Sequence, residues 1–273
     1  MTVPHPDRLP PFVTATDHDE PSVFQVESLL REARRQRQLG ETLVPRVCLL
    51  DPDGDVVRHL APRERATRHQ DWACYHSELW ITDYDGLEIG IVPCAVGAPY
   101  AVLVAEELAA SGCELLVSVT SAGTITALGT PPYFVLIERA LRDEGTSHRY
   151  LPPSEWVTIS AGLTEMLGSA FDDLGEPVHR GVSWTTDAPF RETASAIEAA
   201  CAAGVHAVEM EAAALYAYAQ ARDRDVVCIA HVTNTMATEG DDFEKGHDNG
   251  TGRILDLVAG IARSVAPGRS PHR

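Results

Sequence analysis

Short apolar segments alternate with amphipathic or alanine-rich segments along most of the chain, a pattern typical of an α/β fold. The apolar segments are predicted to be strands, and they cover residues 47–50, 87–94, 114–119, 133–136, 179–184 and 226–232. Residues 72–84 alternate like a further strand, and Asp85-Gly86 after them is a strong hairpin signal toward 87–94.

Helices are predicted between these strands and near both ends of the chain. They cover residues 23–40, a segment beginning at 56, and residues 101–111, 156–176 and 249–265. Ser22 could cap the first helix and Gly40 could end it. No linker or repeat interrupts the alternation, so we expect one α/β domain over residues 43–265 with a mostly parallel or mixed central sheet. An N-terminal extension (1–42) carries the first helix, and residues 266–273 form a tail.

Composition narrows the function classes. The 273 residues carry a formal net charge of −18, so nucleic acids and anionic membrane surfaces are not expected as partners. The six cysteines are widely spaced and form no CxxC pair, which predicts free thiols in a reducing, cytoplasmic setting. We expect no metal, because no His/Cys cluster has zinc spacing and the acidic 239–242 loop lacks calcium spacing.

Two carboxylates flank a methionine where a short apolar strand gives way to an alanine-rich helix: Glu209, Met210 and Glu211. Acids are favourable near a helix N-terminus, which explains one glutamate. The functional interpretation is that a carboxylate accepts hydrogen bonds from the hydroxyls of a ligand while Met210 packs on its apolar face.

Ligands of open α/β sheets bind beyond the carboxyl ends of the strands. Segments rich in small or polar residues follow the predicted strands at 51–58, 95–100, 120–124, 185–192 and 233–244. The backbone N–H of Gly54 and the guanidinium of Arg58 could face an anion, although a plain turn with a surface arginine is the alternative. Thr120 and Ser121 offer hydroxyls that suit an anion or a sugar.

Two further segments could contact a flat heterocycle. Phe190 could stack on a ring while Arg191 bonds to its carbonyl edge; alternatively Phe190 belongs to the core. Asn234 could donate to and accept from the edge of a ring, or it could cap its own loop.

Together these motifs, in this order, resemble the nucleoside phosphorylase superfamily, in particular its uridine phosphorylase and hexameric purine nucleoside phosphorylase branch. The segment 208–215 is similar to the Glu-Met-Glu signature of the family, and 53–58 resembles its Pro-Gly-Asp-Pro-x-Arg phosphate loop. Residues 97–100, 142–147 and 186–192 also resemble family segments, and the whole resemblance covers residues 43–265.

The resemblance implies a three-layer α/β sandwich around a mixed, partly barrel-like sheet. It implies a homo-oligomer, a dimer or trimer of dimers, in which neighbouring subunits share sites. It also implies cleavage of an N-glycosidic bond by phosphate, or by water in the hydrolase branch, without a cofactor and with phosphate as co-substrate.

Roles carry over from the resemblance to individual positions. Glu211 matches the carboxylate that holds the sugar hydroxyls, with Met210 beneath the sugar and Glu209 as its companion. The positions matching phosphate-binding residues are Gly54, Arg58 and Ser121, with Thr120 beside them. Phe190 and Arg191 fall in the base-recognition segment, and Asn234 falls where purine phosphorylases carry a catalytic aspartate.

Two departures affect the prediction. The amide of Asn234 cannot protonate a purine, which leaves a pyrimidine nucleoside, the preferred prediction, or a purine cleaved by a different mechanism. Ser118 and Tyr75-His76 stand where two phosphate-binding arginines are expected. The prediction is therefore a phosphorylase that releases free base and pentose 1-phosphate. The alternatives are a nucleosidase that uses water, and a family member that binds nucleosides without turnover.

Overall fold

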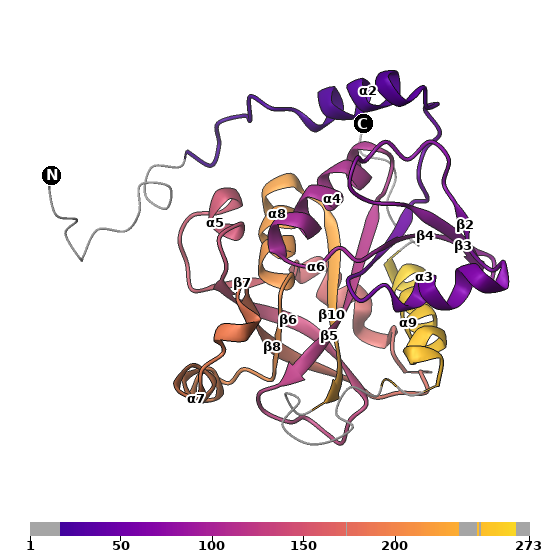
Figure 1. Ribbon diagram of the computed structural model, residues 1–273. Coiled ribbons are helices and arrows are strands. Elements are labelled where there is room, and N and C mark those ends of the chain that lie inside the picture. Colours follow the sequence, from indigo (N-terminus) through magenta and orange to yellow (C-terminus); the bar gives the residue numbers. More distant parts are fainter. Residues whose placement is uncertain (1–16, 173, 235–244, 246, 266–273) are drawn as a thin grey trace, which may run out of the picture.

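The computed structural model describes residues 17–172, 174–234, 245 and 247–265, and Figure 1 shows its arrangement. The strands are β1 (Val47–Asp51), β2 (Thr67–Arg68), β3 (Trp80–Tyr84), β4 (Leu87–Pro93), β5 (Leu115–Thr124), β6 (Tyr133–Asp143), β7 (Trp156–Thr158), β8 (Val178–Thr186), β9 (Ala207–Glu209) and β10 (Asp225–Asn234). The α-helices are α2 (Val26–Arg37), α3 (Asp55–Leu60), α4 (Ala98–Ala110), α5 (Ser147–Tyr150), α6 (Ala161–Met166), α7 (Ala194–Ala202), α8 (Ala212–Arg222) and α9 (Thr251–Val265).

The strands form one mixed sheet that closes on itself at one side. Strand β5 pairs in parallel with both β1 and β10, and β10 continues through β6, β8 and β9 back to β5. These pairings make a closed ring of strands, from which β1, β4, β3 and β2 extend as an open sheet. The mixed central sheet agrees with the α/β class predicted from the alternating pattern.

Helices cover the sheet on opposite sides. Helix α8 packs on α4, α5 and strand β6, whereas α9 contacts α3, α6 and β5 (Figure 1). Tyr216 and Tyr218 on α8 are fully buried, and the hydroxyl of Tyr216 donates to the carbonyl of Ile137 at 2.6 Å. Helix α8 is thus apolar almost all round, which explains its alanine-rich sequence and fixes the loop that precedes it.

The predicted strand 72–84 is too long. Only Trp80–Tyr84 pairs with β4, and the preceding residues form a loop. Arg37 explains the difference, because its guanidinium donates hydrogen bonds to the backbone carbonyls of Trp72, Ala73 and Cys74. Those carbonyls are therefore used by a side chain from α2 and not by a neighbouring strand.

The predicted helix 156–176 is also wrong at its start. Residues 156–158 form β7, which pairs with a part of β6 that extends beyond the predicted end of that strand at 136. Arg139 on β6 lies over the ring of Trp156 at 4.1 Å from its centroid, which favours this pairing. The helix α6 that follows is only six residues long.

The first helix, α2, is shorter than the predicted 23–40: it begins three residues later and ends three residues earlier. Its N-cap is Gln25, since the hydroxyl of Ser22 donates to the carbonyl of Phe24 instead. Its C-cap is Gln38 in the left-handed conformation, and the N–H of Gly40 donates to Asp71. No helix in the described residues is long and apolar enough to cross a membrane.

Candidate functional site

A cavity of about 310 Å³ lies where the carboxyl end of β5 meets the start of α8. Its walls come from four of the segments that the sequence singled out, together with the Glu-Met-Glu stretch. The lining residues are Pro52, Asp53, Val96, Thr120, Ser121, Ala122, Gly123, Pro189, Glu192, Val208, Glu209, Met210 and Glu211. The parallel pairing of β1, β5 and β10 brings these strand ends to one edge of the sheet.

Glu209 is held on every side by protein donors. Its Oε1 accepts from the hydroxyls of Ser183 and Thr185 at 3.0 and 2.5 Å. Its Oε2 accepts from the backbone N–H groups of Glu211 and Ala212, both at 2.7 Å. Glu209, predicted to bind substrate, therefore satisfies the free N–H groups at the start of α8 and shapes the turn that carries Glu211.

Glu211 has one oxygen anchored and one unengaged. Its Oε1 accepts from the backbone N–H of Gly97 at 2.7 Å, whereas its Oε2 is buried and has no hydrogen-bond partner among the described residues. Because a buried polar atom without a partner is costly, the arrangement fits a group that completes its hydrogen bonding with a ligand. Met210 is half-buried and lines the same cavity.

The two acids differ in their protonation state. Burial, followed by the nearby charge of Glu209, raises the pKa of Glu211 to about 8. Burial also raises the pKa of Glu209, but its four hydrogen bonds oppose that effect and favour the ionised form. In the free protein Glu211 therefore keeps its proton near neutral pH, and a ligand with hydroxyl donors favours its release.

The loop after β1 is fixed by Asp51. The N–H of Gly54 donates to the backbone carbonyl and the Oδ1 of Asp51 at 2.9 and 3.1 Å, and Val56 donates to Oδ2. Gly54, predicted to bind phosphate, thus directs its N–H into the loop. It has a φ of 73°, and an added Cβ would lie 2.7 Å from the Sγ of Cys94, so only glycine fits.

Ionised groups surround Ser121 at the end of β5. The N–H and hydroxyl of Ser121 both donate to Oδ2 of Asp53, at 3.1 and 2.5 Å. The ammonium of Lys245 lies 3.0 Å from that oxygen and 2.6 Å from Asp55. Arg58 forms an ion pair with Asp55 and donates to the backbone carbonyl of Asp53 at 3.0 Å.

These contacts decide the charge state of Asp53. Burial acts to raise its pKa, but the ammonium of Lys245 and the hydrogen bonds from Ser121 outweigh burial and hold the pKa below its ordinary value. Asp53 is therefore ionised at neutral pH. The charge of Lys245 in turn is supported by Asp53 and Asp55, which outweigh burial and raise the pKa of the ammonium.

The segment predicted to recognise a base presents other residues to the cavity. Phe190 is 99% exposed and Arg191 is exposed, and neither lines the cavity. Pro189 and Glu192, on either side of them, do line it. The 3-10 turn over Pro189–Arg191 produces this alternation, and burial raises the pKa of Glu192.

The remaining predicted positions have simple placements. Asn234 ends β10 beside Gly123 of β5, and its side chain lies outside the described residues, as do 235–244. Ser118 is buried within β5, and its hydroxyl has no partner among the described residues. The hydroxyl of Tyr75 donates to Gln36 at 2.9 Å, away from the cavity lining. Within the described residues no group of three or more His, Cys, Asp or Glu could hold a metal ion.

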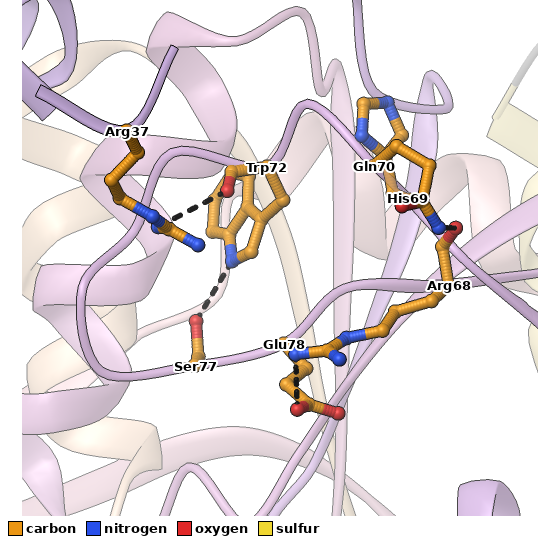
Figure 2. A pocket seen from close by; sticks show the side chains of 7 residues that line it. All are labelled: Arg37, Arg68, His69, Gln70, Trp72, Ser77 and Glu78. Atoms are coloured by element: carbon orange, nitrogen blue, oxygen red, sulfur yellow. Dashed lines mark hydrogen bonds and ion pairs between the residues drawn. The ribbon is translucent and has the colours of Figure 1, made fainter. Parts of the chain in front are cut away.

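A second cavity, of about 190 Å³, lies between the end of α2 and the β2–β3 region (Figure 2). Its polar groups are engaged with each other. Arg68 forms an ion pair with Glu78, and the indole N–H of Trp72 donates to the hydroxyl of Ser77 at 2.9 Å. The guanidinium of Arg37 donates to loop carbonyls, as described above. The residues that line this cavity therefore stabilise the 72–79 loop and leave few polar groups free to bind a ligand.

Comparisons with known proteins agree with this geometry. Residues 46–263 match the phosphorylase superfamily. The chain is 30% identical over 176 residues to a guanosine phosphorylase from Halorubrum lacusprofundi, covering 61% of this chain and 72% of that protein. It is 30% identical over 104 residues to a uridine phosphorylase from Thermococcus kodakarensis, covering 38% of each chain.

The chain belongs to the phosphorylase superfamily. Solved structures of similar fold include a purine nucleoside phosphorylase from Toxoplasma gondii, with a TM-score of 0.69 and 17% identity over 90% of this chain and 97% of that one. A uridine phosphorylase from Vibrio fischeri ES114 gives a TM-score of 0.64 and 19% identity over 84% of this chain and 91% of that one. The superfamily match and the two phosphorylase relatives make this chain an enzyme of the nucleoside phosphorylase type, and the solved structures show its fold.

Sequence reasoning missed several residues of this phosphorylase superfamily site. Ser183 and Thr185 hold Glu209 from β8, and Lys245 balances two acids from a position far along the chain. The alternation of β8 places Ser183 and Thr185 on one face, a signal that was available. Nothing near Lys245 in the sequence indicates its contact with Asp53, which lies 192 positions earlier.

Proposed function

We propose that this enzyme cleaves the N-glycosidic bond of a nucleoside and releases the free base. The observation that carries the proposal is the buried Oε2 of Glu211, which has no partner among the described residues and belongs to a carboxyl that lines the cavity with Met210. A ribose diol supplies the two hydroxyl donors that an ionised carboxylate accepts. Met210 supplies an apolar surface beside it.

Cleavage needs charge relief in two places. The sugar acquires positive charge as the bond breaks, and the carboxylates lining this cavity, Asp53, Glu209 and Glu211, are suited to stabilise it. The departing base acquires negative charge, which hydrogen-bond donors at its edge can accept. We propose a pyrimidine nucleoside as the substrate, because the amide of Asn234 can donate such a bond but cannot supply the proton that a purine leaving group requires.

Two nucleophiles are compatible with this reaction. In the phosphorylase form, phosphate attacks the sugar, enters as co-substrate without any other cofactor, and yields pentose 1-phosphate. Arg58 and Ser121 are the residues proposed for its binding. In the hydrolytic form, water attacks and yields the free pentose. The observation that favours the hydrolytic form, the second candidate, is that both donors of Ser121 already bind Asp53 and are not free to bind phosphate.

The experiment is a panel of uridine, thymidine, inosine and adenosine, each with and without phosphate, with free base followed by chromatography. Release of uracil or thymine ahead of the purines supports the proposal. Release of hypoxanthine or adenine alone contradicts the pyrimidine assignment, and no release from any nucleoside contradicts the proposed reaction. We further propose a homo-oligomer, a dimer or trimer of dimers, which light scattering on the purified protein tests.

A further inference from the structure

One carboxylate of the cavity, that of Asp53, is held by donors of the protein itself. Asp53 reaches from the loop after β1 to the end of β5, where both donors of Ser121 converge on its Oδ2. A backbone N–H, a hydroxyl and the ammonium of Lys245 together form a binding arrangement for one anionic oxygen. In this chain that oxygen belongs to the protein itself.

Among the described residues of one subunit, the charged side chains around this point leave no surplus positive charge for a second anion. Arg58 and Lys245 are positive, and Asp53 and Asp55 are negative, so the four charges sum to zero. His231 lies beside Ser121 in the β5–β10 register and adds no charge, because burial lowers its pKa to about 4.

Asp51 shifts the balance further against an anion. Asp51, which fixes the same loop, can only add negative charge. A multiply charged phosphate would therefore have to displace a carboxylate into an environment that is already neutral or negative, which is unfavourable in a partly buried site.

We propose that Asp53 is a resident anion that occupies the anion subsite of this enzyme, so that water and not phosphate is the nucleophile. The inference rests on the proposed cleavage of a nucleoside and specifies its co-substrate. Asp53 lines the same cavity as Glu211, and its side chain is 35% exposed. Its Oδ1 makes no hydrogen bond with the described residues and can accept one from a water molecule in the cavity.

The reaction balances without any further reagent. The water oxygen forms a bond to C1′ of the sugar while the C1′–N bond breaks. The electron pair of the broken C1′–N bond passes to the base nitrogen. The water gives up one proton to solvent, and the base nitrogen takes one up from solvent. The products are free pentose and free base, and no phosphate ester forms.

The test compares wild type with Asp53→Ala and Asp53→Asn in phosphate-free buffer and with added inorganic phosphate. Base release is followed by chromatography and pentose 1-phosphate by phosphorus NMR. Thermal unfolding of each protein is measured with and without phosphate, which reports both folding and anion binding independently of turnover. Glu88→Gln is the matched control, because it removes one negative charge from the exposed start of β4, outside the cavity lining.

For wild type and Glu88→Gln we expect equal base release with and without phosphate, no pentose 1-phosphate and no phosphate-induced rise in Tm. Asp53→Ala frees two donors and a cation, so we expect its affinity for phosphate to exceed that of wild type by at least about tenfold. That variant should show a phosphate-dependent rise in Tm. Asp53→Asn keeps an acceptor oxygen but no charge, so it should give an intermediate shift.

Base release by wild type only in the presence of phosphate, with pentose 1-phosphate as product, overturns the inference and leaves the proposed cleavage intact. If no protein releases base, the proposed cleavage fails, and the thermal measurement still decides the subsite. An equal phosphate-induced rise in Tm for wild type and Asp53→Ala then overturns the resident anion.

Discussion

The carboxyl group of Glu211 accepts a hydrogen bond at 2.7 Å from the backbone N–H of Gly97, which lies 114 positions earlier in the chain. This contact joins the start of α8 to the loop before α4. It fixes Oε1 of Glu211, while Oε2 stays without a partner among the described residues. The carboxyl group is thereby oriented before any ligand binds, which is the condition for efficient positioning of a sugar.

Replacement of Glu211 by glutamine should remove most of the activity. Glutamine keeps the size of the side chain but accepts only one of the two hydroxyl hydrogen bonds, and it carries no negative charge. Hydrogen bonds to charged groups contribute roughly 1.5–3 kcal/mol each, so kcat/KM should fall about 100-fold or more. Steady-state kinetics on the best nucleoside of the panel provide the measurement, with Glu88→Gln as the unaffected control. Unchanged kinetics in Glu211→Gln would remove this residue from the site.

Nucleoside affinity should rise with pH up to about 8. The pKa of Glu211 is raised to about 8 in the free protein, and ribose hydroxyls donate preferentially to the ionised form. Binding therefore lowers this pKa and releases a proton below pH 8. Calorimetry at pH 7 in two buffers of different ionisation enthalpy should detect the released proton in wild type and none in Glu211→Gln. Affinity that is independent of pH between 6 and 8 would contradict the protonated state of Glu211.

The same raised pKa has a consequence for stability. The unfolded chain gives up the proton of Glu211 near pH 4.5, whereas the folded protein keeps it to about pH 8. The contribution of this group to stability is complete below pH 4.5 and is lost as the pH rises through 8. The Tm of wild type relative to Glu211→Gln should therefore decrease across that window. A difference in Tm that grows with pH would have the wrong sign.

Gly97→Ala should affect both folding and activity. Gly97 has a φ of 90°, a conformation that strains any residue with a Cβ, although no atom lies within 4 Å of the position where that Cβ would be. Backbone strain of this kind destabilises by about 1–3 kcal/mol, and relaxation of the loop would move the N–H that orients Glu211. Gly168→Ala is the matched control, because its position is equally open and its φ is not positive. Equal behaviour of the two variants in denaturant unfolding and kinetics would contradict this role.

Thr185→Val tests the support beneath the two acids. The Thr185 hydroxyl donates to Glu209 at 2.5 Å and accepts from the N–H of Ala213 at 2.9 Å. Valine leaves the Glu209 carboxylate and the N–H of Ala213 buried without this hydrogen-bond partner, which lowers the free energy of unfolding by about 1–3 kcal/mol. We expect a lower free energy of unfolding and a fall in kcat/KM, with recovery of both in Thr185→Ser. Failure of serine to recover activity would show that the methyl group, not the hydroxyl, matters.

The residue pattern predicted the α/β class and the position of the site segments at one edge of the sheet, because both follow from local rules. Apolar runs bounded by polar loops mark buried strands, and parallel strands bring their carboxyl ends together. The pattern could not separate the roles of Glu209 and Glu211. That separation depends on Ser183, Thr185 and Gly97, which reach the two acids only through the pairing of β8 with β9 and the packing of α4 on α8.

A long-range contact explains the error in the predicted strand 72–84, whereas local contacts shape the loop that holds Gly54 and Arg58. The alternation of residues 72–79 is real, but the guanidinium of Arg37 takes the carbonyls that a strand would need. Gly54 and Arg58 occupy a turn of the expected kind, yet Asp51 uses the glycine N–H and Asp55 uses the guanidinium. The contact of Arg37 is not visible from spacing alone, because 35 to 37 positions separate it from these carbonyls. The contacts of Gly54 and Arg58 are with residues three positions away, so the spacing is compatible with them but does not show that they form.

Release of free base from a nucleoside by wild type and by Glu211→Gln tests the central claim most directly. Both proteins are incubated with uridine and inosine, with and without phosphate, after their folding has been checked by thermal unfolding. We predict that wild type releases uracil ahead of hypoxanthine and that Glu211→Gln releases base about 100-fold more slowly or not at all. No base from folded wild type under either condition, or equal release by the two proteins, would contradict the claim.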